Sequence, residues 1–327
     1  MEAGVGLFKI MVLFFVMICF SLQASAWGKR GHSLVCETAA YIASVQESRS
    51  QETHFLKLHS FDLGYYCNVP DLIWKRPGTY KKESINHFMN LEHFERSLSK
   101  EERASKKSPF HLSRKEFDKK YKNISERKGR SWWRIQELDK DLAGVAKKLK
   151  NKKLTRKQHQ ALQVQWLTLA GVMGHYVGDL AMPLHVSENY DGVMTGQKGL
   201  HHYFEETMVD ELYLDKSFGL QARVYQESLK LWPGFLKKAK NKDLLSLIQE
   251  LSSDSQKAAK KLLTLDKKMG RKNFDKALNG HKDLVVQRLT QGVLYQAYMF
   301  HKHLGWDYNG NKFYDFAEKP KFIEYSK

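Results

Sequence analysis

The sequence of 327 residues lacks several patterns that mark common enzyme classes. It has no glycine-rich signature of a Rossmann fold or a P-loop, so we expect no nucleotide cofactor. It also has no solenoid repeat and no convincing series of strands. Apolar residues recur instead at helical spacing, for example from Trp132 to Leu149 and from Leu284 to Leu304. We therefore expect an all-α chain, with a single mostly helical domain over residues 27–327.

Long apolar runs are also scarce. The block over residues 10–22 is too short to span a bilayer comfortably, and Ala24-Ser25-Ala26 follows it as a small-residue cleavage signal. We read residues 1–26 as a signal peptide, which makes Trp27 the mature N-terminus. No second stretch is apolar enough for a membrane span. The protein is therefore expected to be secreted or periplasmic.

Cysteine is rare as well. Only Cys36 and Cys67 follow the predicted leader, and in an oxidising compartment they could form one disulfide. Their spacing and apolar surroundings allow this pairing without requiring it.

Acidic residues are few relative to basic ones, with 36 Asp and Glu against 54 Lys and Arg. The formal net charge of +18 favours polyanions such as nucleic acid, anionic lipid or cell-wall polymer, although a simply solvated basic surface fits equally well. Residues 96–130 hold 13 Lys and Arg against five Asp and Glu, and we expect an exposed basic excursion there. Residues 64–85, with their Gly and Pro, are expected to be rich in loops.

The stretch Gly174–His185 lies at the end of a nearly all-round apolar run from Ala161 to Leu180, which predicts a buried helix. His175 and Asp179 are four residues apart, so a helix places both side chains on one face. Pro183 cannot continue that helix, and His185 should follow from the turn beyond it. A metal ion is the usual partner of such buried groups. A satisfied core histidine and a helix-capping aspartate are the alternative.

Further candidate ligands lie in apolar, aromatic or turn contexts along the chain. His201 and Glu205 repeat the four-residue spacing of His175 and Asp179, and two such pairs with His185 predict a multinuclear site whose nitrogen and oxygen ligands suit zinc best. We treat His301 and His303 as structural. Six other histidines in mostly polar surroundings are discounted: His54, His59, His93, His111, His159 and His281. The candidate ligands in chain order are His32, Asp71, His87, His175, Asp179, His185, His201 and Glu205.

Together these motifs resemble the S1/P1 nuclease and zinc-dependent phospholipase C superfamily. The resemblance rests on Trp27-Gly-x-x-Gly-His32, Asp71, His87-Phe-x-Asn, Gly-His175-x-x-Gly-Asp179-x-x-x-Pro-Leu-His185 and His201-x-x-x-Glu205, in that order. It covers residues 27 to about 210 and extends to the last helix. It implies an all-α fold of the phospholipase C/P1 nuclease type with three zinc ions.

The resemblance also assigns the ligands. Asp71, His87, His175 and Asp179 would hold one zinc, and Asp179 would bridge to a second, bound also by His32 and by the α-amine and carbonyl of Trp27. His185, His201 and Glu205 would hold the third. A hydroxide bridging two zinc ions would attack phosphorus, with Asp71 as the catalytic residue that orients the water or accepts its proton. In the nuclease branch, the products carry a 5′-phosphate.

The zinc ligands do not separate the two branches. Glu205 and the short gap from His185 to His201 look more like the phospholipase branch, whereas the N-terminal spacing looks like the nuclease branch. A choline-binding site would need an acid and aromatics where this chain has Arg30, Leu72 and Ser84. Phe88 and Asn90 could stack on and hydrogen-bond an unpaired base, although Phe88 fits core packing equally well. We favour an endonuclease for single-stranded DNA or RNA.

Two alternatives stay open at this point. One is a phospholipase C that acts on phospholipid headgroups, for which anionic phospholipid would be the partner. The other is a non-catalytic zinc protein whose lysines bind polyanions. Structural zinc sites are usually closed and rich in cysteine, which does not match these histidine and carboxylate ligands. We expect the protein to be a monomer.

Overall fold

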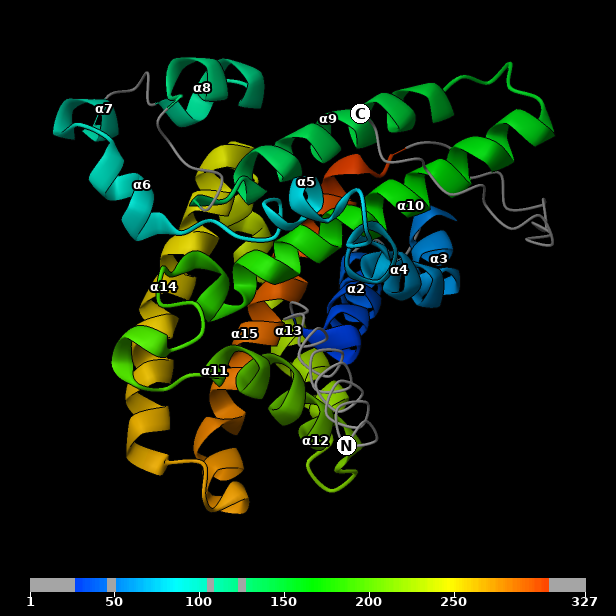
Figure 1. Ribbon diagram of the computed structural model, residues 1–327. Helices are drawn as coiled ribbons and strands as arrows, with labels where there is room; N and C mark the ends of the chain where they lie inside the picture. The colour runs from blue at the N-terminus through cyan, green and yellow to red at the C-terminus, as the bar shows by residue number, and fades with distance from the viewer. Residues whose placement is uncertain (1–26, 46–50, 105–108, 123–127, 306–327) are drawn as a thin grey trace, which may run out of the picture.

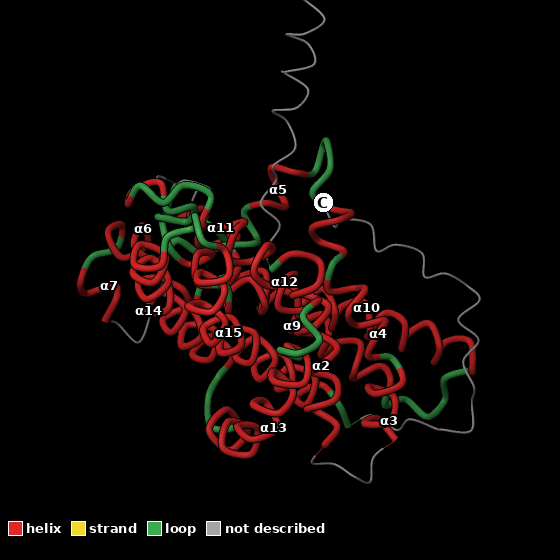
Figure 2. The backbone as a smooth tube through the Cα atoms, turned by 90° about the horizontal axis from the view of Figure 1, so that it is seen from below, coloured by secondary structure: helices red, strands yellow, loops and turns green. Residues whose placement is uncertain are grey.

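The structure, a computed structural model, describes residues 27–45, 51–104, 109–122 and 128–305. These residues form an all-α fold without strands; Met89 and Gly129 make an isolated bridge (Figure 2). No helix in the described ranges is both long and apolar enough to cross a membrane. The elements in chain order are α2 (Gly28–Val45), α3 (Gln51–Leu58), α4 (Ser60–Cys67), η1 (Pro70–Trp74), α5 (Tyr80–Ser84), α6 (Leu91–Ser97), α7 (Lys100–Ala104), η2 (Pro109–His111), α8 (Arg114–Lys120), α9 (Ser131–Leu149), α10 (Arg156–Ala181), η4 (Pro183–Val186), η5 (Val193–Thr195), α11 (Leu200–His202), η6 (Tyr203–Thr207), α12 (Met208–Leu214), α13 (Leu220–Ala239), α14 (Leu244–Met269) and α15 (Phe274–His303).

Helix α10 lies at the centre of the fold and contacts α2, α4, α9, α14 and α15 (Figure 1). It begins at a capping box. The Thr155 hydroxyl accepts from the backbone N–H of Gln158, and the Gln158 side chain accepts from the backbone N–H of Thr155. All its residues from Trp166 to Ala181 are buried. Pro183 ends the helix, as the sequence predicts, and begins the 3-10 turn η4.

The end of α10 is held by a buried arginine from α15. Arg288 is 2% exposed and donates from Nε to the Ala181 carbonyl at 2.9 Å. Its Nη2 also donates to Ser255, whose hydroxyl bonds the Leu180 carbonyl. These bonds satisfy carbonyls that a helix end leaves without internal partners. The turn that carries His185 therefore starts from a fixed point.

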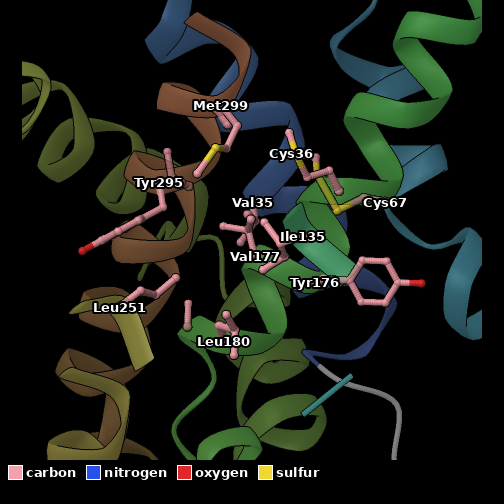
Figure 3. Close-up of a cluster of buried hydrophobic side chains, with 14 of the residues drawn as sticks. Val35, Cys36, Cys67, Ile135, Tyr176, Val177, Leu180, Leu251, Tyr295 and Met299 are labelled. Atoms are coloured by element: carbon pink, nitrogen blue, oxygen red, sulfur yellow. A yellow bond between two sulfur atoms is a disulfide. The ribbon is translucent and has the colours of Figure 1, made fainter. Parts of the chain in front are cut away.

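Close helix packing surrounds the middle of α10. Cys36 on α2 and Cys67 on α4 form a disulfide beside it, within a cluster of buried hydrophobic side chains (Figure 3). A Cβ at Gly171 would lie 2.5 Å from the Tyr66 Cβ and 3.0 Å from the Leu63 carbonyl oxygen. A Cβ at Gly174 would collide with Cys36 Sγ. Glycine at both positions therefore lets α2 and α4 approach α10 closely.

The prediction of a loop-rich region over residues 64–85 is wrong. This part of the chain contains the second half of α4, the π-helical turn η1 and the short helix α5. Gly64 does not break α4, because it packs against Glu37 of α2, and Pro70 stands at the start of η1 where it needs no N–H donor. The helix predicted over Leu284–Leu304 begins earlier than expected, at Phe274.

The described residues of the basic segment 96–130 form helices that its composition does not indicate. Its described residues include α7, η2 and α8. Phe117 of α8 is fully buried, with its ring centroid 4.4 Å from that of Trp133 in α9. Aromatic packing on α9 therefore holds this segment against the fold. The predicted leader 1–26 and residues 306–327 of the predicted domain lie outside the described residues.

Candidate metal centre

His175 and Asp179 lie on one face of α10, as their spacing predicts. The His175 Nε2 atom is 3.4 Å from Asp179 Oδ2, and both side chains are completely buried. His32 of α2 faces the same carboxylate, with its Nε2 3.4 Å from Asp179 Oδ1. The rings of His32 and His175 stack with centroids 3.9 Å apart. Gly178 leaves room for this arrangement, because a Cβ there would lie 3.1 Å from His32 Nδ1.

Asp71 and His87 complete a second group around His175. The His87 Nδ1 atom is 2.9 Å from His175 Nε2, 3.5 Å from Asp71 Oδ1 and 3.0 Å from Asp179 Oδ2. Asp71 lies in the π-helical turn η1, and such turns often occur at functional sites. Asp179 thus contacts ligands of both groups, as a bridging carboxylate must.

His185, His201 and Glu205 form a third group. The His185 Nε2 atom lies 3.1 Å from His201 Nε2 and 3.5 Å from Glu205 Oε2. The His201 Nε2 atom lies 3.0 Å from the same Glu205 oxygen. Glu205 lies in a second π-helical turn, η6. The three groups, each with ligand atoms within 4.8 Å of one another, bring together all eight side-chain ligands predicted from the sequence.

In each histidine of the third group, one ring nitrogen bonds a backbone carbonyl and the other faces the remaining ligands. In the third group, His185 Nδ1 donates to the His87 carbonyl at 2.6 Å and His201 Nδ1 to the Tyr190 carbonyl at 2.8 Å. A carbonyl only accepts, so in the neutral rings the two Nε2 atoms carry lone pairs that face each other and Glu205. A single proton can bridge only two of these three atoms, whereas a divalent cation can bind both Nε2 atoms and a Glu205 oxygen at once. The residues therefore fit a metal ion.

Orphaned polar atoms support the same conclusion. Both oxygens of Asp179, both oxygens of Glu205 and both ring nitrogens of His32 are buried without a hydrogen bond of ordinary geometry. Such groups are costly in a core unless something compensates them. Nitrogen and carboxylate ligands of this kind suit zinc.

Electrostatics keep the ligands in the form that binds metal. Burial opposes ionisation of Asp71, yet Lys75 and the imidazoles of His175 and His87 hold its pKa well below its usual range. Burial lowers the pKa of His175 to about 3, so this ring is neutral. Burial opposes protonation of His201, but the Glu205 charge raises its pKa overall, so protons and metal compete there.

Trp27 lies against the first group. Its side chain is completely buried, and its indole N–H donates to the Gly178 carbonyl on α10 at 2.7 Å. Its own carbonyl accepts from the Gly31 N–H at 3.1 Å. The ring centroids of Trp27 and Phe204 are 5.9 Å apart. The first described residue is thus fixed beside Gly178 and His32, where the sequence predicted a terminal ligand.

The predicted substrate residues lie beside the second group. Phe88 is half-buried and packs against Gly129, while Asn90 is 8% exposed and precedes α6 as its N-cap residue. Arg30, which stands where a choline site would need an acid, pairs with Asp210. Leu72 is 59% exposed. Base stacking by Phe88 and hydrogen bonding by Asn90 stay predictions.

Two buried charged residues were missed by the sequence analysis. Lys75 Nζ lies 2.6 Å from Asp71 Oδ1, and Glu83 Oε1 lies 3.1 Å from His87 Nε2. Burial raises the pKa of Glu83, but His87, Tyr176 and Arg134 together lower it to about 2. Each of these residues is four positions from its ligand, which is the spacing that identified His175 and Asp179. Two discounted histidines, His59 and His281, are also buried.

Comparison with known families agrees with this geometry. The model of the family described as S1/P1 Nuclease matches residues 27–304, a span that contains every candidate ligand from Trp27 to Glu205. No sequence in a search of curated proteins matches the chain. The family match covers most of the chain and confirms the resemblance that its motifs indicated. This chain therefore belongs to the S1/P1 nuclease family.

Proposed function

We propose that this protein is a zinc-dependent endonuclease that hydrolyses single-stranded DNA and RNA and leaves 5′-phosphate ends. Membership of the family implies a phosphodiester hydrolase with a nucleic acid substrate. The observation that carries the finer proposal is that three ligand groups are buried together, with the Asp179 carboxylate near a residue of each. The Asp179 Oδ1 atom lies 3.4 Å from His32 Nε2 and 3.9 Å from His185 Nδ1. The Asp179 Oδ2 atom lies 3.0 Å from His87 Nδ1.

S1/P1 nucleases are zinc-dependent, and we assign three zinc ions to this chain. Bound zinc would acidify a water molecule and neutralise charge on the phosphate. The proposed ligands are Asp71, His87, His175 and Asp179 for one ion; Asp179, His32 and the Trp27 amine and carbonyl for the second; and His185, His201 and Glu205 for the third.

Asp71 is the proposed catalytic residue. Its carboxylate stays ionised beside the Lys75 ammonium, with side chains only 4% and 8% exposed. An ionised carboxylate at the edge of the second group can orient a water molecule or accept its proton on an oxygen. Lys75 favours the charged carboxylate and so limits how tightly Asp71 holds that proton. No covalent intermediate with the protein is needed.

Substrate contacts are proposed for Phe88 and Asn90 next to His87. Phe88 is half-buried, and its ring is proposed to stack on a base. The basic segment 96–130 packs on the same part of the fold, since the Asn90 N–H donates to the Lys128 carbonyl at 3.0 Å. Its lysines and arginines are proposed to follow the phosphate backbone. Phospholipid is the alternative substrate that the experiment must separate.

The experiment uses the mature chain beginning at Trp27. Zinc content is measured first, and then the release of acid-soluble nucleotides from heat-denatured DNA and RNA beside diglyceride release from mixed liposomes. We expect nucleotide release that is lost with EDTA and in His175→Ala. His281→Ala is the matched control, because His281 is equally buried but belongs to none of the metal groups. Diglyceride release alone, or polyanion binding without turnover, would overturn the proposal.

The N-terminal ligand gives a separate test. An α-amine exists at Trp27 only after the leader is removed, and its pKa near 8 allows it to lose a proton beside a divalent cation. S1/P1 nucleases are typically secreted, so removal of the leader would complete the site during export. A protein extended by Gly before Trp27 is expected to bind less zinc than the mature chain. Equal zinc content and equal activity would contradict this ligand.

A further inference from the structure

Glu83 is a completely buried carboxylate beside the candidate metal centre. It lies on the five-residue helix α5, in a sequence context of lysines and serine. Its Oε1 accepts hydrogen bonds from His87 Nε2, at 3.1 Å, and from the Tyr176 hydroxyl. Its Oε2 accepts from the Asn86 side-chain amide at 3.1 Å. Three donors therefore hold one carboxylate at a fixed position.

The residues around Glu83 are themselves held by other helices. Tyr176 follows His175 directly on α10, and the Arg134 guanidinium of α9 lies 5.6 Å from the Tyr176 ring centroid. Arg114 of α8 donates to the Asn86 side-chain oxygen at 2.9 Å. Helices α8, α9 and α10 thus restrain Glu83 through its partners. Arg114 belongs to the basic segment, which gives part of that segment a structural role.

His87 differs from the other imidazoles of the centre in the nitrogen that it presents. His175, His185 and His201 each bond a backbone carbonyl through Nδ1 and turn Nε2 inward. His87 turns Nδ1 inward, 3.0 Å from Asp179 Oδ2, and directs Nε2 at Glu83. Glu83 is an acceptor, so it keeps a proton on Nε2. Asp179 is an acceptor as well, and a metal ion among Asp71, His175 and Asp179 would displace any proton from Nδ1 and bind its lone pair.

We propose that Glu83 is a positioning residue that fixes the tautomer and orientation of His87, so that Nδ1 binds the metal ion of the second group. This inference rests on the proposed zinc centre. A carboxylate hydrogen-bonded to a metal-binding imidazole also raises the basicity of that ligand, and losing such a partner typically weakens metal affinity about 10–100-fold. Glu83 itself touches neither the other ligands nor the substrate position assigned to Phe88.

The test compares Glu83→Gln with Asp139→Asn. Asp139 is the matched control, because its Oδ1 contacts His303 Nε2 at 2.7 Å in a pair outside the three metal groups. Zinc affinity is measured by competition with a chromophoric chelator. We expect one zinc of Glu83→Gln to bind about 10–100-fold more weakly. The affinity of the remaining zinc ions, and of all those in Asp139→Asn, should be unchanged.

Nitrogen-15 NMR of the histidine rings in the zinc-loaded protein reads which nitrogen of His87 carries the proton. His87 should be protonated at Nε2 in the wild type, and Glu83→Leu should lose this preference. If Glu83 variants do not fold, Tyr176→Phe removes one donor to Glu83 and should weaken the same zinc several-fold. Unchanged zinc affinity in Glu83→Gln, or an equal loss in Asp139→Asn, would overturn the inference. A wild type without zinc would instead overturn the proposed function.

Discussion

Two parts of the metal centre are built in different ways. The helix-held group (His32, His175 and Asp179) comes from α2 and α10, whose facing residues form the buried middle of the fold. The turn-held group (His185, His201 and Glu205) comes from η4, α11 and the π-helical turn η6. The helix-held group inherits its geometry from core packing, whereas the turn-held group needs other support.

Part of that support comes from a polar clamp around Arg271. Arg271, just beyond α14, donates to the carbonyls of Gln197 and Lys198 at 2.7 and 2.9 Å. It also forms an ion pair with Asp266, with 2.8 Å between Nε and Oδ1, and Asp266 accepts from the Gln197 side chain at 2.8 Å. These bonds fix the segment that leads into His201. A few polar contacts thus fix the ligands of the turn-held group, whereas close helix packing fixes those of the helix-held group.

The largest expected effect follows from the position of Asp179 between the groups. Asp179→Asn replaces the carboxylate that contacts His32, His87 and His175 with a neutral amide. We expect zinc to be lost from the two groups that share Asp179 and retained by the turn-held group, and hydrolysis to fall below detection. Zinc counting by native mass spectrometry checks this. Loss of a single zinc would show that Asp179 does not bridge.

Breaking the clamp should affect only the turn-held group. Arg271→Met keeps an unbranched apolar stem but leaves the Asp266 carboxylate, 5% exposed, without its cation. Leaving a buried acceptor unsatisfied costs about 1–3 kcal/mol, so we expect a loss of that order in the free energy of unfolding. One zinc should also bind more weakly. Chelator competition and urea unfolding measure these effects.

Arg223→Met is the control for the clamp, because Arg223 is an exposed arginine whose Nε donates to the Phe218 carbonyl. It should leave all zinc affinities unchanged. An equal loss of zinc in both variants would contradict the role of the clamp.

A smaller effect is expected where the helices pack most closely. Gly171→Ala would place a Cβ 2.5 Å from the Tyr66 Cβ and 3.0 Å from the Leu63 carbonyl oxygen, atoms that cannot rotate away. Overpacking costs about 1–3 kcal/mol, which exceeds the gain of about 0.5–1 kcal/mol from replacing a helical glycine. Thermal and urea unfolding should therefore show a less stable protein.

Gly144→Ala is the matched control for that substitution. Gly144 lies within α9, and a Cβ there meets nothing within 4 Å. Only the gain of about 0.5–1 kcal/mol then applies, so this variant should be slightly more stable than the wild type. If Gly171→Ala were stabilising as well, close packing of α4 on α10 would not hold the helix-held group.

Much of the centre could be predicted from the sequence, because ligand identity and helical spacing are local properties. His175 with Asp179, and His201 with Glu205, each lie one helical turn apart, and Pro183 marks where the helix must end. Helix α9 follows from apolar residues at helical spacing, and α10 follows from a run that is apolar nearly all round.

The supporting residues could not be predicted, because their burial depends on tertiary packing. Lys75 and Glu83 lie in a stretch with Pro77, Gly78 and several lysines, which by composition indicates a solvated loop. Their pairing becomes visible only in the folded chain, where Glu83 accepts from the Tyr176 hydroxyl and Lys75 forms an ion pair with Asp71. The packing of α8 within the basic segment 96–130 was missed for the same reason, since Phe117 gains its burial from Trp133.

The most direct test of the account is the zinc content of the mature chain. Native mass spectrometry of protein beginning at Trp27, purified without chelators and with zinc supplied, counts the ions held by each molecule. The three ligand groups predict three zinc ions per chain, all removed by EDTA. A count of two or fewer in folded protein would contradict the centre described around Asp179.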